Sequence, residues 1–463
     1  MPGGAFAANG SAGRRTWSAG STGYNDCSRP EQVGKDMPPR WSGVNEEFFD
    51  DFRRLEDLVL YARRLVAQRP DLVVLRSIGR SWQGRVLEVL EVTRRGASDD
   101  GPEDKPCIFI SAGIHAREWI APATVMYIAD TLVRKADEPQ VKHILDKYLV
   151  SIVFVANPDG YVYTWTTDRM WRKDRSDRPH FSCENLVAGV DLNRNWGFAW
   201  GRTENTFYKR RLHDPCSDVF IGPGPFSEPE TLALSEYLRQ RQQRSYERGM
   251  RVEGRSVSPG PGFVSAFLDF HSYSQVLLPP WGFTAQAPSN ADGAYQTLLV
   301  NDMARAYLRT SGRSYKVGAD VYPPDPGTGP DWAYGTLGVR AAMTVELEGN
   351  VSDSFCAPRS VIRSVGVEQW AGICALVDHL DLHGSEPSRF QGIFAHDGAG
   401  RELRKQLRTQ APVVDVWDVK AIAMAAFVLV LISGAGCLWR SRQTRRRNLA
   451  TPLAGYERTA GVE

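Results

Sequence analysis

The chain alternates between short apolar runs and stretches in which apolar residues recur at helical spacing. Apolar side chains three and four residues apart predict an amphipathic helix at 48–68, and further helices are expected at 122–134 and 361–380. Strands are predicted for the short apolar runs 86–92, 107–114, 149–156, 264–270 and 341–347. The tetrapeptide Asn-Pro-Asp-Gly at 157–160 predicts a turn, and the polar stretch 239–262 predicts a solvent loop. Strands alternating with helices are typical of an α/β domain with a mixed, mainly parallel sheet and helices on both faces.

The two ends of the chain differ in composition from this domain. Residues 1–42 are rich in small residues without a pattern, so we expect disorder there. One domain is expected over 43–383, followed by a polar linker at 384–418. Residues 421–439 carry no charge, which predicts a transmembrane helix over 419–439. A buried core helix is the alternative, but it would normally have a polar face.

The charges next to this helix predict how it lies in a membrane. Arginines crowd into 440–447, so 440–463 is expected to be a basic cytoplasmic tail, with the domain extracellular or lumenal. That orientation needs an export signal, and residues 1–40 contain no apolar core typical of a signal peptide. Either the N-terminus of this chain is incomplete, or the last helix inserts after synthesis and the domain stays in the cytosol.

Composition narrows the class of protein. At 463 residues, with 42% hydrophobic and 24% charged residues, the chain has the balance of a globular protein. A net charge of +2 implies no broad basic field, so no nucleic-acid partner is expected. Of seven cysteines, Cys437 falls in the apolar run, and the other six could pair but need not.

Four residues together have the chemistry of a metal-dependent hydrolase. His115 and Glu118 are three residues apart after a predicted strand, so a first helical turn would project both from one face. Imidazole nitrogens and carboxylate oxygens both bind zinc, although such a pair also arises by chance at a helix start. His271 closes another predicted strand, where open α/β sheets place their sites, and is the best candidate for a third ligand. Glu346 is a carboxylate among apolar neighbours, which indicates either a catalytic base or a structural ion pair.

Seven motifs carry a resemblance to a known family. They are HAREW at 115–119, NPDGY at 157–161, WRK at 171–173, GVDLNRNW at 189–196, HSYSQ at 271–275, DWAY at 331–334 and TVEL at 344–347. In this order and spacing, the stretch from Gly43 to Leu382 resembles the zinc metallocarboxypeptidases of the pancreatic carboxypeptidase A/B type. The resemblance implies a mixed, mostly parallel eight-stranded twisted sheet, one Zn²⁺ per chain, and a monomer that acts on peptides or proteins with a free C-terminus.

The resemblance also assigns catalytic roles by position. It implies that His115, Glu118 and His271 bind the zinc ion. Glu346 would be the general base that takes a proton from water and delivers it to the leaving amine. Arg172 would stabilise the developing oxyanion. Taken alone, an arginine such as Arg172 is more often a solvated surface charge, and only the shared pattern favours the catalytic role.

Four further residues match positions that bind the substrate. Asn193, Arg194 and Tyr322 would bind its C-terminal carboxylate, since a guanidinium holds a carboxylate through two parallel hydrogen bonds. Arg117 would contact the substrate further from its end. The loop at 321–330 departs from the family in length and is richer in proline, which makes Tyr322 the least supported of these assignments.

Two other features follow from the same resemblance. Cys183 and Cys216 match a disulfide of many family members, which favours an oxidising compartment over the cytosol. No room exists before residue 43 for the folded activation domain of many relatives, so we expect a form without a pro-segment or an incomplete chain.

In the resembled family, the residue just before the Asp-Trp motif helps to line the specificity pocket. Pro330 occupies this position, or Gly329 if the insertion is placed differently, and Leu278 and Gly282 nearby are also neutral. These residues predict a preference for hydrophobic or aromatic C-terminal residues. Asp325, reaching in from the altered loop, would instead favour Lys or Arg, as in a basic-residue-specific carboxypeptidase.

Two rival functions remain open. The first is a catalytically silent, carboxypeptidase-like binding module tethered to the membrane, although no metal ligand or base is missing. The second is a cytosolic deglutamylase, whose acidic substrates would need a basic pocket that the sequence does not reveal.

Overall fold

An eight-stranded mixed sheet forms the centre of the computed structural model, which describes residues 45–94, 104–178, 182–183, 186–253, 263–349 and 355–387. The strands are β1 (Val73–Arg80), β2 (Val86–Val92), β3 (Cys107–Ala112), β4 (Leu149–Val153), β7 (Val264–His271), β8 (Val276–Leu278), β9 (Lys316–Val317) and β10 (Ala341–Glu346). They lie in the order β1-β2-β4-β3-β7-β10-β8-β9. The central strands β4, β3, β7 and β10 are parallel, β1 and β2 join antiparallel, and β8 pairs antiparallel with β10 and parallel with β9. The predicted fold class is confirmed.

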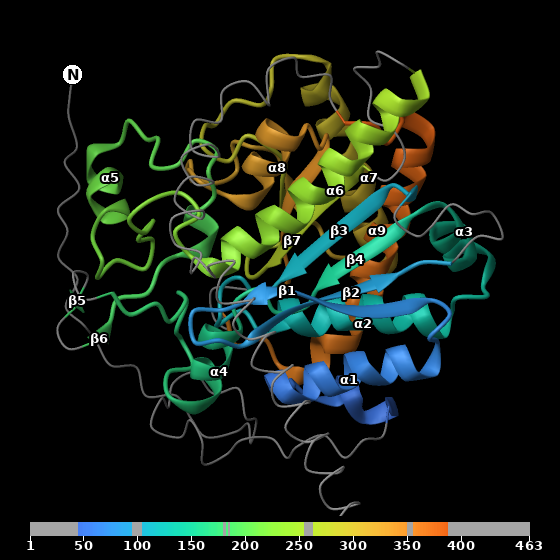
Figure 1. The fold of residues 1–463 in the computed structure, drawn as a ribbon, viewed down its shortest axis with the longest axis horizontal. Coiled ribbons are helices and arrows are strands. Elements are labelled where there is room, and N and C mark those ends of the chain that lie inside the picture. Colours follow the sequence, from blue (N-terminus) through green and yellow to red (C-terminus); the bar gives the residue numbers. More distant parts are fainter. Residues whose placement is uncertain are drawn as a thin grey trace, which may run out of the picture. The chain divides into compact units, whose positions relative to one another are not determined.

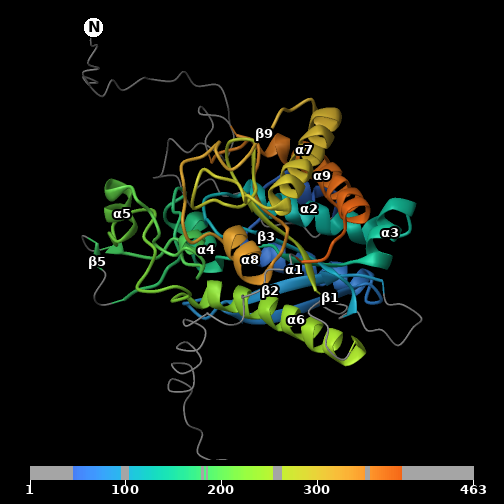
Figure 2. The same ribbon diagram turned by 90° about the horizontal axis from the view of Figure 1, so that it is seen from above.

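Helices cover both faces of this sheet (Figures 1 and 2). One face is covered by α1 (Leu55–Gln68), α2 (Ile120–Arg134), α7 (Ala291–Ser311) and α9 (Ile362–His383). The other face is covered by α6 (Pro229–Glu253) and α8 (Gly329–Leu337). Shorter elements connect these layers: α3 (Pro139–Lys147), α4 (Pro158–Thr166), α5 (Thr206–Leu212), the hairpin β5–β6 (Ser182–Cys183 and Leu186–Val187), and the 3-10 helices η2 (Asn45–Asp50), η4 (Leu192–Arg194) and η5 (Arg359–Val361).

Side-chain alternation along β7 separates the core from the site. Leu268 and Phe270 pack into the apolar cluster beneath α2, α7 and α9, whereas Phe267 packs into the cluster beneath α6 and α8. Because successive side chains point to opposite faces, His271 lies on the same face as Phe267. The parallel register pairs His271 with Glu346 at the end of β10. Two of the predicted site residues are therefore neighbours at the carboxyl end of the sheet.

The predicted helix at 48–68 and the predicted turn at 157–160 both differ from the structure. The helix expected at 48–68 is divided, because η2 ends at Asp50 and α1 begins only at Leu55. The turn expected at 157–160 is the start of α4: the Asn157 side chain caps the helix by accepting a hydrogen bond from Gly160 N at 2.9 Å, and Pro158 occupies the first turn.

The solvent loop expected at 239–262 is also wrong over most of its length, because α6 continues to Glu253. Arg and Gln are good helix formers, so a polar composition does not exclude a helix. Gln242 is buried and ties this helix to two neighbours: its Oε1 accepts from Val264 N at 2.9 Å and its Nε2 donates to Leu337 O at 3.3 Å. Residues 254–262 lie outside the described residues.

The predicted terminal segments fall mostly outside the described part of the chain. These are the disordered segment 1–42, most of the linker 384–418, the membrane helix 419–439 and the tail 440–463. Within the described ranges, no helix has both the length and the apolar character that crossing a membrane requires.

Close packing of α9 on α7 depends on the absence of a side chain at Gly372. A Cβ atom there would lie 2.3 Å from Cε1 of the fully buried Tyr307. We predict that Gly372→Ala lowers the melting temperature, because overpacking costs about 1–3 kcal/mol and exceeds the gain of ~1 kcal/mol in helix propensity. Calorimetry of the variant beside Val367→Ala, which alters an exposed position of the same helix, tests this. An unchanged or raised melting temperature for Gly372→Ala would contradict the packing account.

Candidate active site

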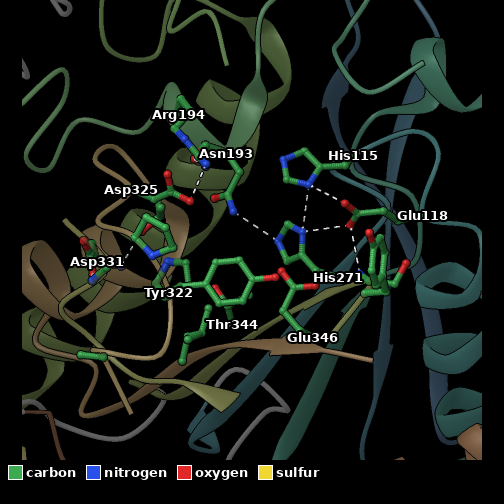
Figure 3. Close-up of a pocket in the computed structure, with 18 of the residues that line it drawn as sticks. His115, Glu118, Asn193, Arg194, His271, Tyr322, Asp325, Asp331, Thr344 and Glu346 are labelled. Atoms are coloured by element: carbon green, nitrogen blue, oxygen red, sulfur yellow. Dashed lines mark hydrogen bonds and ion pairs between the residues drawn. The ribbon is translucent and has the colours of Figure 1, made fainter. Parts of the chain in front are cut away.

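A pocket at the carboxyl ends of β7 and β10 collects most of the predicted site residues (Figure 3). Its lining includes His115, Glu118, Arg172, Asn193, Arg194, His271, Tyr322 and Glu346. Arg117 is outside this lining; its guanidinium lies 4.2 Å over the ring of Phe355, which does line the pocket. Segments far apart in the sequence therefore meet in one place.

Three candidate metal ligands converge in this pocket. His115 Nδ1 lies 2.9 Å from Glu118 Oε1 and 3.0 Å from His271 Nδ1, and His271 Nδ1 lies 3.0 Å from Glu118 Oε2. All three side chains are buried. His115 and Glu118 lie in the turn between β3 and α2, not in a first helical turn as predicted, because α2 begins only at Ile120.

Buried carboxylates hold the outer nitrogens of both histidines. His271 Nε2 lies 2.9 Å from Asp269 Oδ2, and His115 Nε2 lies 3.1 Å from Asp191 Oδ1. A carboxylate accepts a proton donor, so these contacts place the N–H on the outer nitrogen and leave an unprotonated Nδ1 facing the pocket. Two such nitrogens 3.0 Å apart beside a carboxylate favour a cation between them. The donor set, two imidazoles and one carboxylate with an open side, fits catalytic zinc.

The charges around these residues also favour a cation in the pocket. Burial opposes a charge on His271, but the carboxylates of Asp269 and Glu118 outweigh burial and raise the pKa of His271 well above its usual value. Burial would likewise raise the pKa of Glu118, but His115 and His271 together lower it. Without a metal, a proton on His271 balances the carboxylates, and a zinc ion would take over that role.

Asp191 organises both a ligand and a guanidinium. Its Oδ2 accepts hydrogen bonds from Arg172 Nε and Nη2 at 3.0 and 2.9 Å, while its Oδ1 faces His115. Arg172 Nη1 is thereby directed toward the metal ligands and lies 3.2 Å from His115 Nδ1. The Arg172 guanidinium is thus positioned to stabilise negative charge next to the metal site.

Glu346 is poised to exchange protons. Its Oε2 is inaccessible to solvent and has no hydrogen-bond partner among the described residues. Loss of solvation raises the pKa of Glu346 to about 8. A nearby cation would favour the carboxylate form, so the group would titrate in a range suitable for a general base.

Three predicted carboxylate-binding residues occupy different parts of the pocket. Asn193 Nδ2 lies 3.2 Å from His271 Nε2, and its Oδ1 accepts from Gly329 N at 3.0 Å. Arg194, which follows it in η4, forms an ion pair with Asp325 at 2.6 Å. Tyr322 is 36% exposed, and its hydroxyl donates to Ser274 Oγ at 2.9 Å. Asn193 and Arg194 are therefore held in place, whereas Tyr322 lies at the rim.

Three of the four neutral residues named from the sequence line the pocket, and Gly329 is outside this lining. The three are Leu278, Gly282 and Pro330, with Thr344 beside them. Asp331 also belongs to this lining, but its two oxygens accept the backbone N–H groups of Gly282 and Phe283 at 2.7 and 2.9 Å. Burial raises the pKa of Asp331 to about 7.

Three residues of the site were not predicted from the sequence. Asp269 is a carboxylate inside an apolar strand, the same signal that identified Glu346, and it also accepts from Ser111 Oγ at 2.6 Å. Asp191 lies inside the motif at 189–196 but was given no role. Tyr208 contacts Arg194 from α5, a segment that carried no recognisable pattern.

The one disulfide that was predicted from the sequence is confirmed. Cys183 and Cys216 form a disulfide. Cys107 and Cys374 are free and buried, and Cys356 is disulfide-bonded.

The zinc carboxypeptidase family model matches residues 58–372, the segment that supplies the pocket. The chain belongs to the zinc carboxypeptidase family. Carboxypeptidase A2 of Rattus norvegicus is 31% identical over 361 residues, covering 77% of this chain and 76% of the relative. Carboxypeptidase B of Astacus astacus is 34% identical over 315 residues, covering 67% of this chain and 90% of the relative.

Two further comparisons involve an inactive relative and a crystal structure. An inactive metallocarboxypeptidase of Ajellomyces dermatitidis is 31% identical over 378 residues, which cover 77% of this chain and 59% of that protein. The crystal structure of carboxypeptidase A from Helicoverpa armigera superposes with a TM-score of 0.61 at 27% identity, covering 77% of this chain and 79% of the insect chain. The relatives thus include proteins named as A-type and B-type carboxypeptidases and one named as inactive.

The carboxylate behind His271 provides a test of the metal site. We predict that Asp269→Asn weakens zinc binding by about 10–100-fold, because the ring loses the charged partner that orients it. Competition with a chromophoric chelator measures the affinity. Asp218→Asn, which removes an exposed carboxylate near Arg117, should leave zinc affinity unchanged. Equal zinc affinity for Asp269→Asn and the unmodified chain would show that Asp269 does not support the metal site.

Proposed function

We propose that this protein is a zinc-dependent metallocarboxypeptidase that hydrolyses the C-terminal peptide bond of peptides or proteins. The observation that carries the proposal is the convergence of His115 Nδ1, His271 Nδ1 and Glu118 in one pocket with Glu346, whose Oε2 has no partner among the described residues.

The chemistry follows from the positions of the side chains. A zinc ion held by His115, Glu118 and His271 would polarise the scissile carbonyl and acidify a water molecule. Glu346 accepts a proton from that water as its oxygen attacks the carbonyl carbon, and then delivers the proton to the leaving amine as the C–N bond breaks. Arg172 Nη1 donates to the carbonyl oxygen as negative charge develops there.

Recognition of the chain end restricts the reaction to C-termini. Arg194 and Asn193 lie in the pocket beyond the metal ligands (Figure 3). The Arg194 guanidinium would bind a terminal carboxylate and so place the last peptide bond next to Glu346.

The pocket supports a preference for hydrophobic or aromatic C-terminal residues. Leu278, Gly282 and Pro330 are uncharged, and the carboxylate of Asp331 is occupied by backbone N–H groups. Asp325 is engaged by Arg194, so neither acid presents a free charge to a Lys or Arg side chain. A B-type preference and a catalytically silent binding module are the two alternatives that an assay must separate.

We predict chelator-sensitive release of Phe and Leu when the zinc-loaded chain is incubated with matched peptides ending in Phe, Leu, Lys or Glu. Glu346→Gln should lower kcat by at least about 10²-fold while zinc stays bound, because the base is lost and the ligands remain. Glu348→Gln is the matched control, since Glu348 pairs with Arg313 at 2.7 Å.

Each other outcome identifies a different error. Preferred release of Lys would favour the B-type enzyme. A lack of hydrolysis with one zinc bound per chain would favour the binding module. Loss of zinc in Glu346→Gln would show that the roles of base and ligand are wrongly assigned.

We further propose that residues 419–439 tether the enzyme to a membrane, with the catalytic domain extracellular or lumenal and 440–463 in the cytoplasm. The uncharged run 421–439 and the arginines after it support this arrangement.

We predict that alkaline carbonate leaves the full chain in the membrane pellet and releases a chain that ends at residue 418. Release of the full chain by carbonate would refute the proposal. So would protection of a C-terminal tag when protease is added to sealed membrane vesicles whose cytosolic face is outside.

A further inference from the structure

Arg194 already holds a carboxylate inside the pocket. Its Nη2 forms an ion pair with Asp325 Oδ2 at 2.6 Å, which Figure 3 shows as a direct contact. Tyr208 donates its hydroxyl hydrogen to the other oxygen of Asp325 at 2.5 Å. Arg194 Nε in turn donates to the Tyr208 oxygen at 3.2 Å. Both oxygens of Asp325 are therefore engaged inside the pocket, one by Arg194 and the other by Tyr208.

The backbone of the proline-rich loop holds Asp325 at this place. Asp325 N donates to Gly282 O at 2.7 Å, and Gly327 O accepts from Trp196 N at 3.1 Å. Gly327 has a φ of 76°, and a Cβ atom there would lie 2.4 Å from Arg194 O, so the loop packs directly against Arg194. Prolines on both sides of Asp325 restrict the backbone further. The backbone of the loop thus places Asp325 next to Arg194.

Every nitrogen of the Arg194 guanidinium has a partner in this arrangement. Nη1 donates to Asn193 O at 2.9 Å, Nε donates to Tyr208, and Nη2 faces Asp325. A substrate carboxylate that takes the Nη2 position of Asp325 must displace it, and one that binds beside Asp325 is repelled by its negative charge. The Asp325 side chain is 32% exposed, whereas that of Arg194 is 6% exposed, so the aspartate has solvent to rotate into and the arginine has not.

We propose that Asp325 is an internal competitor for the C-terminal carboxylate of the substrate and sets the affinity of the pocket for chain ends. This inference rests on the proposed function. With Asp325 in place, the buried guanidinium is neutralised before substrate arrives. A ligand binds only if the free energy gained from its carboxylate and its other contacts exceeds the free energy lost when the ion pair between Arg194 and Asp325 breaks. Asp325 therefore weakens the binding of every free carboxylate, whatever side chain accompanies it.

The test compares the full zinc-loaded chain with Asp325→Asn. The KM for peptides ending in Phe and in Lys, and the Kd of N-acetyl-phenylalanine measured by calorimetry, should all fall by about tenfold, with the change in KM and not in kcat. N-acetyl-phenylalaninamide, which has no carboxylate, should bind both proteins equally. Asp320→Asn is the matched control, because it removes an exposed charge from the same loop region without a contact to Arg194.

A second variant keeps the test informative if Asp325→Asn folds poorly. Tyr208→Phe removes one of the two hydrogen bonds that hold Asp325, so the Kd of N-acetyl-phenylalanine should fall by a smaller factor.

Unchanged KM and Kd values would overturn the inference. So would weaker binding of the Lys peptide alone, because Asp325 would then serve the side-chain pocket. The calorimetric measurement needs no turnover, which separates the two proposals. Tighter binding of N-acetyl-phenylalanine without any hydrolysis would support the competitor and refute the enzyme, whereas hydrolysis with an unchanged Kd would refute only the competitor.

Discussion

The pairing of two buried carboxylates with the outer nitrogens of His115 and His271 is the constraint on which the site depends. Asp191 and Asp269 decide which nitrogen of each ring carries its proton, and thereby turn two lone pairs toward one point in the pocket. Asp269 is held by Ser111 on the neighbouring strand, so the register of the sheet determines the orientation of a ligand. Asp191 also binds Arg172, which couples the position of this guanidinium to that of a candidate metal ligand.

The sheet provides the rigidity that this pairing needs. The parallel strands β3, β7 and β10 are buried between two helical layers, and their carboxyl ends present Ser111, Asp269, His271 and Glu346 to the same face. The cost of placing charges there is offset by matching each one with an opposite charge or a hydrogen-bond donor. Among the described residues that line the pocket, Glu346 Oε2 and the Ser272 hydroxyl have no hydrogen-bond partner, and an unsatisfied carboxylate oxygen is what the proposed general base requires.

The chemistry of the site could be predicted from the sequence more completely than its supporting contacts. His115, Glu118, His271 and Glu346 were identified because metal ligands and a lone carboxylate in an apolar strand are local signals. Asp191 and Tyr208 were missed because their roles arise from contacts between distant segments. Patterns of polarity also misled: α6 is a helix in spite of its polar composition, and 157–160 begins α4 because Asn157 and Pro158 favour a helix start as much as a turn. The ion pair of Arg194 with Asp325 could not have been foreseen from an insertion of unknown path.

The most direct test of this account is the position of the metal. A crystal of the zinc-loaded protein, measured at the zinc absorption edge, would place the ion by anomalous scattering. We expect one peak in the pocket, about 2.0–2.2 Å from Nδ1 of His115, Nδ1 of His271 and an oxygen of Glu118. A peak bonded to the Nε2 atoms, or no peak at these three residues, would contradict the claim that Asp191 and Asp269 orient the two histidines toward a shared cation.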